Sequence, residues 1–103
     1  MIAFNIYYGT IGKTLGEKYR FTKNCKNEQE ALKIAKNAAS SFYYKNEGKY
    51  GLPSFMDITK ESELTGVSIE KLYEEHIEDM TRYHVIPTEL DTISSKKLRW
   101  WLL

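Results

Sequence analysis

The chain is short of cysteine, of long apolar runs and of net charge. Cys25 is the single cysteine among 103 residues, which excludes an internal disulfide bond and a zinc site built from several cysteines. The longest apolar runs are short and interrupted, so we expect no transmembrane helix and no membrane partner. Residues 1–10 have no basic stretch ahead of their apolar residues, unlike a signal peptide, and we expect a cytoplasmic protein.

A complete phosphate-binding motif is also missing, although residues 9–14 (GTIGKT) come near one. Only two residues separate the first glycine from the Gly-Lys pair, whereas the Walker motif has four at that place. These residues lead into a predicted strand, while a phosphate loop must open a helix whose N–H groups hold the anion. A hairpin turn explains the glycines better, and no cofactor is expected.

Metal-binding and catalytic groupings are equally hard to assemble. His76 and His84 are eight residues apart, or about 12 Å along a single helix. They cannot share one metal ion, because each ligand atom must lie about 2 Å from it. Cys25 stands in a basic stretch that would lower its pKa, but a strand-end thiol is the simpler interpretation. We therefore predict no metal site, no catalytic residue and a protein that is not an enzyme.

What the chain does contain is enough apolar surface for one domain over residues 1–103. Hydrophobic residues make up 42% and aromatic residues 14%, which a disordered chain would not carry. The net charge of +1 conceals a strong division along the chain. Residues 1–53 hold nine Lys or Arg and four acids (+5), residues 54–79 hold two and eight (−6), and residues 80–103 hold four and two (+2). Such a division bears on binding partners more than on the fold.

The first half of the chain predicts a β-hairpin followed by a helix. Residues 2–8 are rich in β-branched and aromatic side chains, residues 17–23 alternate in polarity, and a glycine-rich loop separates them. Asn27 is placed to cap a helix that runs to about Lys45, with Glu30 closing a capping box. The apolar positions of this helix form a wide stripe, which favours packing against the hairpin.

The middle of the chain predicts two short helices joined at a glycine. Ser54 is placed to cap a helix over about 55–64, Gly66 to end it, and Ser68 to cap the next helix. Phe55 of the first of these helices is expected in the core, as is Phe42 before it. The second helix has the clearest 3.6-residue period of apolar residues in the chain, namely Ile69, Leu72, Tyr73, His76, Ile77, Met80, and Tyr83 or His84.

This pair resembles a helix-turn-helix over roughly twenty residues. The motif's small residue, turn glycine, apolar residue, cap and core leucine correspond to Ser62, Gly66, Val67, Ser68 and Leu72. The resemblance implies a second helix that enters the DNA major groove. However, the outer face of that helix is acidic and would be repelled by a phosphate backbone, and Glu61 replaces a usually apolar residue. We interpret the resemblance as a packing geometry, not as DNA binding.

The last part of the chain leaves two alternatives open. Val85 and Ile86 precede Pro87, which favours extended backbone and allows a short third strand. Residues 94–103 predict either a terminal helix or a final strand. The overall expectation is an α+β domain with an N-terminal two-stranded hairpin and a third strand left open. The hairpin packs on an amphipathic helix, and a helix-turn-helix-shaped pair and a short C-terminal element follow.

The acidic outer face of the second helix of the pair is the leading functional candidate. It comprises Glu70, Glu74, Glu75, Glu78 and Asp79. A solvated surface explains these charges, but so does a surface selected to bind a basic surface on a protein partner, with Trp100 as an anchor. An inhibitor of that kind would present carboxylates where the partner expects phosphates, by analogy with small inhibitors from phages and other mobile elements. The amphipathic helix also leaves a homodimer open.

A nucleic-acid-binding regulator is the alternative. Tyr43, Tyr44 and Tyr50 are interleaved with Lys45 and Lys49, and aromatic rings among basic residues can stack on the bases of single strands. The basic first half of the chain would supply further attraction for phosphates.

Overall fold

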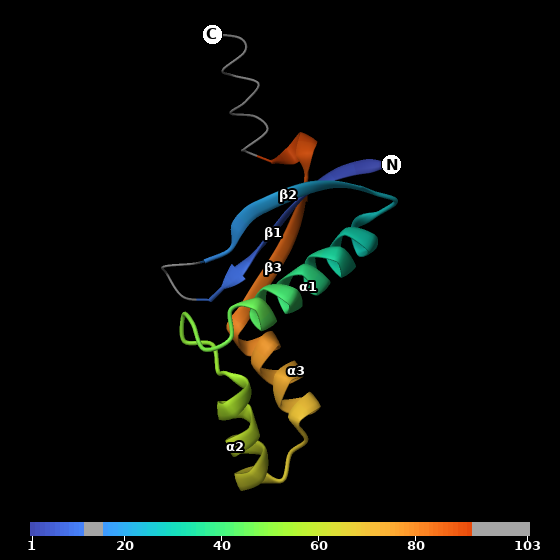
Figure 1. Ribbon diagram of the computed structural model, residues 1–103. Coiled ribbons are helices and arrows are strands. Elements are labelled where there is room, and N and C mark those ends of the chain that lie inside the picture. Colours follow the sequence, from blue (N-terminus) through green and yellow to red (C-terminus); the bar gives the residue numbers. More distant parts are fainter. Residues whose placement is uncertain (12–15, 92–103) are drawn as a thin grey trace.

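The computed structural model describes residues 1–11 and 16–91 and shows the expected α+β architecture (Figure 1). Three antiparallel strands form one sheet in the order β2-β1-β3: β1 (Ile2–Thr10), β2 (Lys18–Cys25) and β3 (Thr81–Pro87). The predicted hairpin is confirmed as the β1–β2 pair, and β1 lies in the centre of the sheet. The third strand, which the sequence left open, is present and pairs with β1 over its full length.

α1 (Glu28–Lys45) lies across one face of the sheet. The Asn27 side chain accepts a hydrogen bond from the Glu30 N–H at 2.9 Å, so the predicted cap is confirmed. The Glu30 carboxylate accepts from the Lys26 N–H at 2.8 Å, one residue before the N-cap, so the predicted return bond of the capping box is displaced by one residue. α1 is thereby anchored at the end of the strand from which the chain enters it.

The first of two cores lies between α1 and the sheet. Alternate residues of β1 point to this face, because successive side chains of a strand point to opposite sides. Small alanines on α1 let the helix approach the sheet closely. The buried residues are Phe4, Ile6, Cys25, Ala31 and Ala35, and Tyr8, Phe21, Ile34 and Val85 pack around them.

α2 (Phe55–Thr65) and α3 (Ile69–Met80) extend beyond the end of the sheet (Figure 1). Ser54 caps α2 in a full capping box with Asp57, and the Ser68 side chain caps α3. Gly66 ends α2 in the left-handed conformation at φ 74°, which glycine adopts without steric cost. Both predicted helices and their predicted ends are confirmed within one residue, apart from the end of α3.

The second core joins these helices to the end of α1. Its buried residues are Tyr43, Leu52, Ile58, Leu72 and Tyr73, with Val67, Ile69, Ile77 and Met80 around them. The Tyr43 hydroxyl donates to the Pro53 carbonyl at 2.9 Å, which satisfies its polar atom inside the core. Phe42 is partly buried and packs edge-on against Tyr8. Phe55 is 57% exposed, so its predicted place in the core is wrong.

α3 ends at Met80, and the expected continuation of its stripe to Tyr83 or His84 is wrong. Residues 81–87 instead alternate as a strand, because pairing with β1 satisfies their backbone groups and the apolar face of β3 joins the first core. A short 3-10 turn, η1 (Thr88–Leu90), follows β3. None of the described helices is long and apolar enough to cross a membrane.

Candidate interaction surface

The acidic face predicted from the sequence lies on the outward side of α3. This face consists of Glu70, Glu74, Glu75, Glu78 and Asp79, and all five side chains are exposed. Their exposure follows from the burial of Leu72 and Tyr73 on the opposite side of the same helix. The apolar stripe and the acidic face are therefore two sides of one amphipathic helix, as the periodicity indicates.

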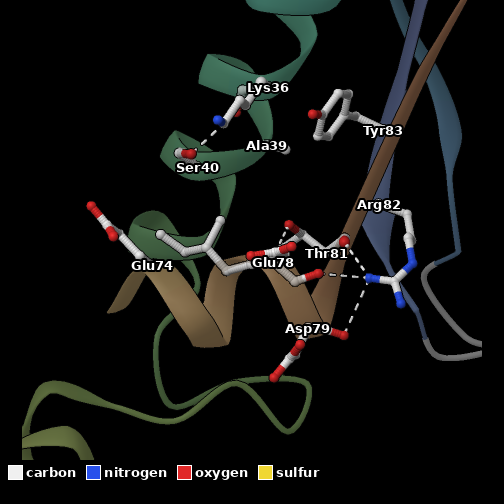
Figure 2. A pocket seen from close by; sticks show the side chains of 10 residues that line it. Lys36, Ala39, Ser40, Glu74, Glu78, Asp79, Thr81, Arg82 and Tyr83 are labelled. Atoms are coloured by element: carbon white, nitrogen blue, oxygen red, sulfur yellow. Dashed lines mark hydrogen bonds between the residues drawn. The ribbon is translucent and has the colours of Figure 1, made fainter. Parts of the chain in front are cut away.

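The carboxylates of the acidic face make no ion pair with any residue that the structure describes. Arg82 is the nearest arginine along the chain, but its guanidinium donates to the main-chain carbonyls of Glu78, Asp79 and Thr81 at 2.8, 3.3 and 2.8 Å (Figure 2). A cation in that place neutralises the negative end of the helix dipole. Arg82 thus caps the end of α3 through backbone atoms rather than through the acidic side chains.

Three members of the acidic face border a groove between α3, α1 and β3 (Figure 2). The groove has a volume of about 780 Å³, and Glu74, Glu78 and Asp79 line its α3 side. Lys36, Ala39 and Ser40 of α1 line the opposite side, and Tyr83 of β3 lies between. Figure 2 shows Glu74 and Asp79 pointing in different directions from α3, so their charges do not converge on one point of the groove. Glu70 and Glu75 lie outside this groove.

Glu61, which departs from the helix-turn-helix pattern, pairs with a residue of the next helix. Its carboxylate lies 2.9 Å from Nε2 of His76, so the pair connects α2 to α3. Ser62 adds a second link by donating to the Val67 carbonyl at 2.6 Å across the Gly66 turn. The polar residue at position 61 is thus explained by its partner on α3, which the sequence pattern of the motif could not show.

The aromatic and basic residues predicted for nucleic-acid binding do not all lie on the surface. Tyr43 is fully buried, so its predicted surface role is wrong. Tyr44 and Tyr50 are 51% and 60% exposed, and Lys45 and Lys49 are also exposed. Tyr50 has a φ of 55°, a left-handed conformation that is uncommon for a bulky side chain. The exposed part of this group therefore consists of two tyrosines and two lysines around the loop after α1.

A polar network, which was not predicted from the sequence, lies on the face of the sheet opposite α1. Asp91 is 2% exposed and accepts hydrogen bonds from the Asn5 amide at 2.7 Å and the Tyr7 hydroxyl at 2.6 Å. The Tyr7 ring stacks on His84 with centroids 4.5 Å apart, and burial together with Asp91 raises the pKa of Tyr7 to about 12. The alternation of polar Asn5 and Tyr7 with apolar Phe4 was the available signal, but the partner lies 84 or more residues away.

The groups considered for catalysis or metal binding are engaged elsewhere. Cys25 is buried at the end of β2, where burial raises the pKa of its thiol, so the expected lowering by its basic neighbours is wrong. His84 lies on β3 and contacts Glu17, so it does not share a helix with His76 as the spacing argument assumed. Among the described residues, no cluster of three His, Cys, Asp or Glu side chains could hold a metal ion.

Other predictions concern residues that the structure does not describe, or a surface that it places differently. Trp100 and the alternative of a terminal helix or strand lie outside the described residues, as does the second half of the GTIGKT stretch. The apolar stripe of α3 packs into the second core, so it is not free to pair with a second copy in the way the sequence suggested. Comparisons of the chain with protein-family models, with curated proteins and with solved structures find no match in any of the three.

Proposed function

We propose that the protein is a non-enzymatic interaction module whose acidic face binds a basic surface on a partner protein. The observation that supports this most is that all five carboxylates are exposed and none makes an ion pair with a described residue. Glu70, Glu74 and Glu78 are spaced four residues apart, and like charges at this spacing destabilise a helix by a few tenths of a kcal/mol per pair, roughly. These like charges have no paired cation among the described residues, so the cationic side chains of a partner could neutralise them.

The groove beside the acidic face suits the long side chains of lysine and arginine. Such side chains cover apolar surface with their methylene groups while the charged end meets a carboxylate. Ala39 of α1 and Ile77 of α3 supply apolar lining to the groove. Glu74 and Glu78, which are also on α3, supply carboxylate acceptors beside it. Arginine is favoured over lysine, because its planar guanidinium can bind a carboxylate through two parallel hydrogen bonds.

The more specific form of this proposal is an inhibitor of a nucleic-acid-binding protein in the cytoplasm. In that case the carboxylates occupy positions at which the partner normally holds phosphates, and the acidic face competes with DNA or RNA. Phage and mobile-element inhibitors of this kind are the analogy. The net charge of −6 over residues 54–79, from two lysines and eight acids, supports this form because long-range attraction speeds association with a basic surface.

A charge-reversal experiment tests the proposal. The tagged full chain and its Glu74→Lys/Glu78→Lys variant are used to capture proteins from a lysate of the source cells, and each captured protein is then purified and titrated against both. We expect the variant to bind its partner at least tenfold more weakly, and a short DNA duplex to displace the wild type. Glu28→Lys/Glu89→Lys makes the same change in net charge at exposed acids outside residues 54–79 and should bind as the wild type does. Equal binding by all three chains would reduce the acidic face to a solvated surface.

Nucleic-acid binding through the loop after α1 is the second proposal. It is supported by the exposure of Tyr44 and Tyr50 beside Lys45 and Lys49, and by the strained backbone that holds Tyr50. Base stacking on an aromatic side chain contributes about 1–3 kcal/mol per base. Labelled single-stranded DNA should therefore bind the wild type with strong salt dependence and lose affinity in Tyr44→Ser/Tyr50→Ser. An absence of binding at physiological ionic strength would exclude this second proposal and leave the first untouched.

A further inference from the structure

The outward side of α2 exposes two large apolar side chains, Met56 and Leu64, on one line with Lys60 between them, and we call this line the apolar stripe of α2. Ile58 is the one buried residue of α2. Met56 and Leu64 are 68% and 87% exposed, and Phe55 next to them is 57% exposed. Met56, Lys60 and Leu64 are spaced four residues apart, so they form one line along the helix. Large apolar side chains exposed along one line of a helix are a candidate contact for a partner.

The chain contains a segment whose chemistry matches this stripe. Residues 96–103 (KKLRWWLL) combine three cations with five large apolar residues and contain no acid. α2 has Asp57, Glu61 and Glu63 against Lys60, and residues 54–79 as a whole carry −6. An apolar centre with a charged rim is the usual anatomy of a protein interface, and tryptophan and arginine are favoured at its anchors. The two surfaces are thus complementary both in apolar character and in charge.

The distance along the molecule favours a second copy, rather than the same molecule, as the source of the residues 96–103 that contact α2. Asp91 is held at Asn5, whereas α3 ends beside Thr10, about 17 Å further along β1. The 12 residues of α3 add about 18 Å. α2 ends at Thr65, at the end of the helical pair that is remote from the sheet, and Leu64 is one residue before that end. Lys96 is five residues beyond Asp91 and can lie at most about 18 Å from it. Within one molecule, only a fully extended segment would bring the tryptophans to Leu64.

We propose that residues 96–103 of a second copy dock on the apolar stripe of α2, with Met56 and Leu64 receiving the tryptophans. The exchange is reciprocal, so the dimer closes and contains two such contacts. Each tryptophan buries about 150–250 Å², so four of them bury on the order of 800 Å². Together with the surfaces that receive them, the total approaches the roughly 1,600 Å² of a standard stable interface. The acidic face on α3 is not used and stays open to a different partner.

Tryptophan fluorescence of the full chain, combined with sedimentation velocity, tests this dimer. The chain has two tryptophans, Trp100 and Trp101, so its tryptophan emission reports on this segment alone. We expect the wild type to sediment as a dimer with emission typical of buried tryptophan, and dilution to shift the emission to longer wavelength. Met56→Ser/Leu64→Ser should be a monomer with solvent-exposed emission at all concentrations. Ile11→Ser, which removes an exposed apolar residue in the β1–β2 hairpin, should behave as the wild type does.

Three outcomes would overturn the proposal. A wild type that is monomeric with exposed tryptophan would show that nothing of this chain covers α2. A dimer that survives in Met56→Ser/Leu64→Ser would place the contact elsewhere. A monomer whose buried emission is lost in that variant would assign the stripe to the segment of the same molecule. Glu74→Lys/Glu78→Lys should leave the dimer intact, so a failure of this dimer and a failure of the proposed function can be told apart.

Discussion

The two halves of the molecule bury their residues in different ways. The sheet unit is formed by β1, β2, β3 and the first turns of α1, and its buried core residues are Phe4, Ile6, Cys25 and two alanines, packed against a three-stranded hydrogen-bonded sheet. The helical unit, formed by α2, α3 and the end of α1, has a core in which two of five buried residues are tyrosines. α2 contributes a single buried residue, whereas β1 contributes Phe4 and Ile6 together. We therefore expect the sheet unit to be the more stable part of the fold, whereas the helical unit carries the acidic face.

This contrast predicts that a cavity in the sheet unit destabilises the whole chain, whereas a similar cavity in the helical unit destabilises mainly α2 and α3. Ile6 of β1 is fully buried between the sheet and α1. Ile6→Ala should therefore lower the free energy of unfolding by about 3 kcal/mol and increase amide hydrogen exchange throughout the chain. Ile58→Ala should increase exchange mainly in α2 and α3, because those helices can open while the sheet remains formed. If Ile58→Ala increased exchange in β1 as much as in α2, the two units would form one cooperative core.

Alkaline pH should affect the helical unit strongly, because it buries tyrosines. Burial is the main cause that raises the pKa of Tyr43 from 10.0 to about 12, and it raises the pKa of Tyr73 as well. The unfolded chain loses the Tyr43 proton first as the pH rises above 10. The stability that neutral Tyr43 contributes is therefore complete below pH 10 and is lost between pH 10 and 12, by up to about 3 kcal/mol.

Denaturant titrations at a series of pH values measure this loss. Tyr43→Phe should cost about 1 kcal/mol at neutral pH, because it loses the hydrogen bond to the Pro53 carbonyl. The variant should also lose less stability than the wild type above pH 10. A variant with the same alkaline loss as the wild type would assign that loss to Tyr73, or to Tyr7 in the sheet unit, whose pKa is also raised to about 12.

The smallest predicted effect concerns the turn within the helical unit. Gly66 has a φ of 74°, and a methyl group added to it would meet no atom within 4 Å. Gly66→Ala should therefore cost only the strain of a left-handed alanine, about 1 kcal/mol, without a steric clash. Lys60→Ala, at an exposed position of the same helix, should change thermal stability by much less. A loss well above 1 kcal/mol would indicate that the turn also holds the two helices in register.

Much of the fold was predictable from local sequence because its signals are short-range. Ser54 and Ser68 start helices at the predicted positions, and Gly66 ends one, because each satisfies or releases backbone groups within a few residues of itself. The acidic face was predictable for the same reason, since a 3.6-residue period places Glu70, Glu74 and Glu78 opposite the buried Leu72. The end of α3 was not, because pairing with β1, more than seventy residues earlier, recruits Thr81–Pro87 into the sheet.

Periodicity and neighbours along the chain were sufficient to predict the α+β class, the positions of the helix caps and the acidity of α3. Which aromatic residues are buried depends on how the elements pack in three dimensions, and this packing places Tyr43 inside and Phe55 outside. The same packing pairs Glu61 with His76 and brings Asp91 to Asn5 and Tyr7. The physical reason is that burial and polar pairing depend on groups that become neighbours only when the sheet closes and α2 and α3 pack beyond its end.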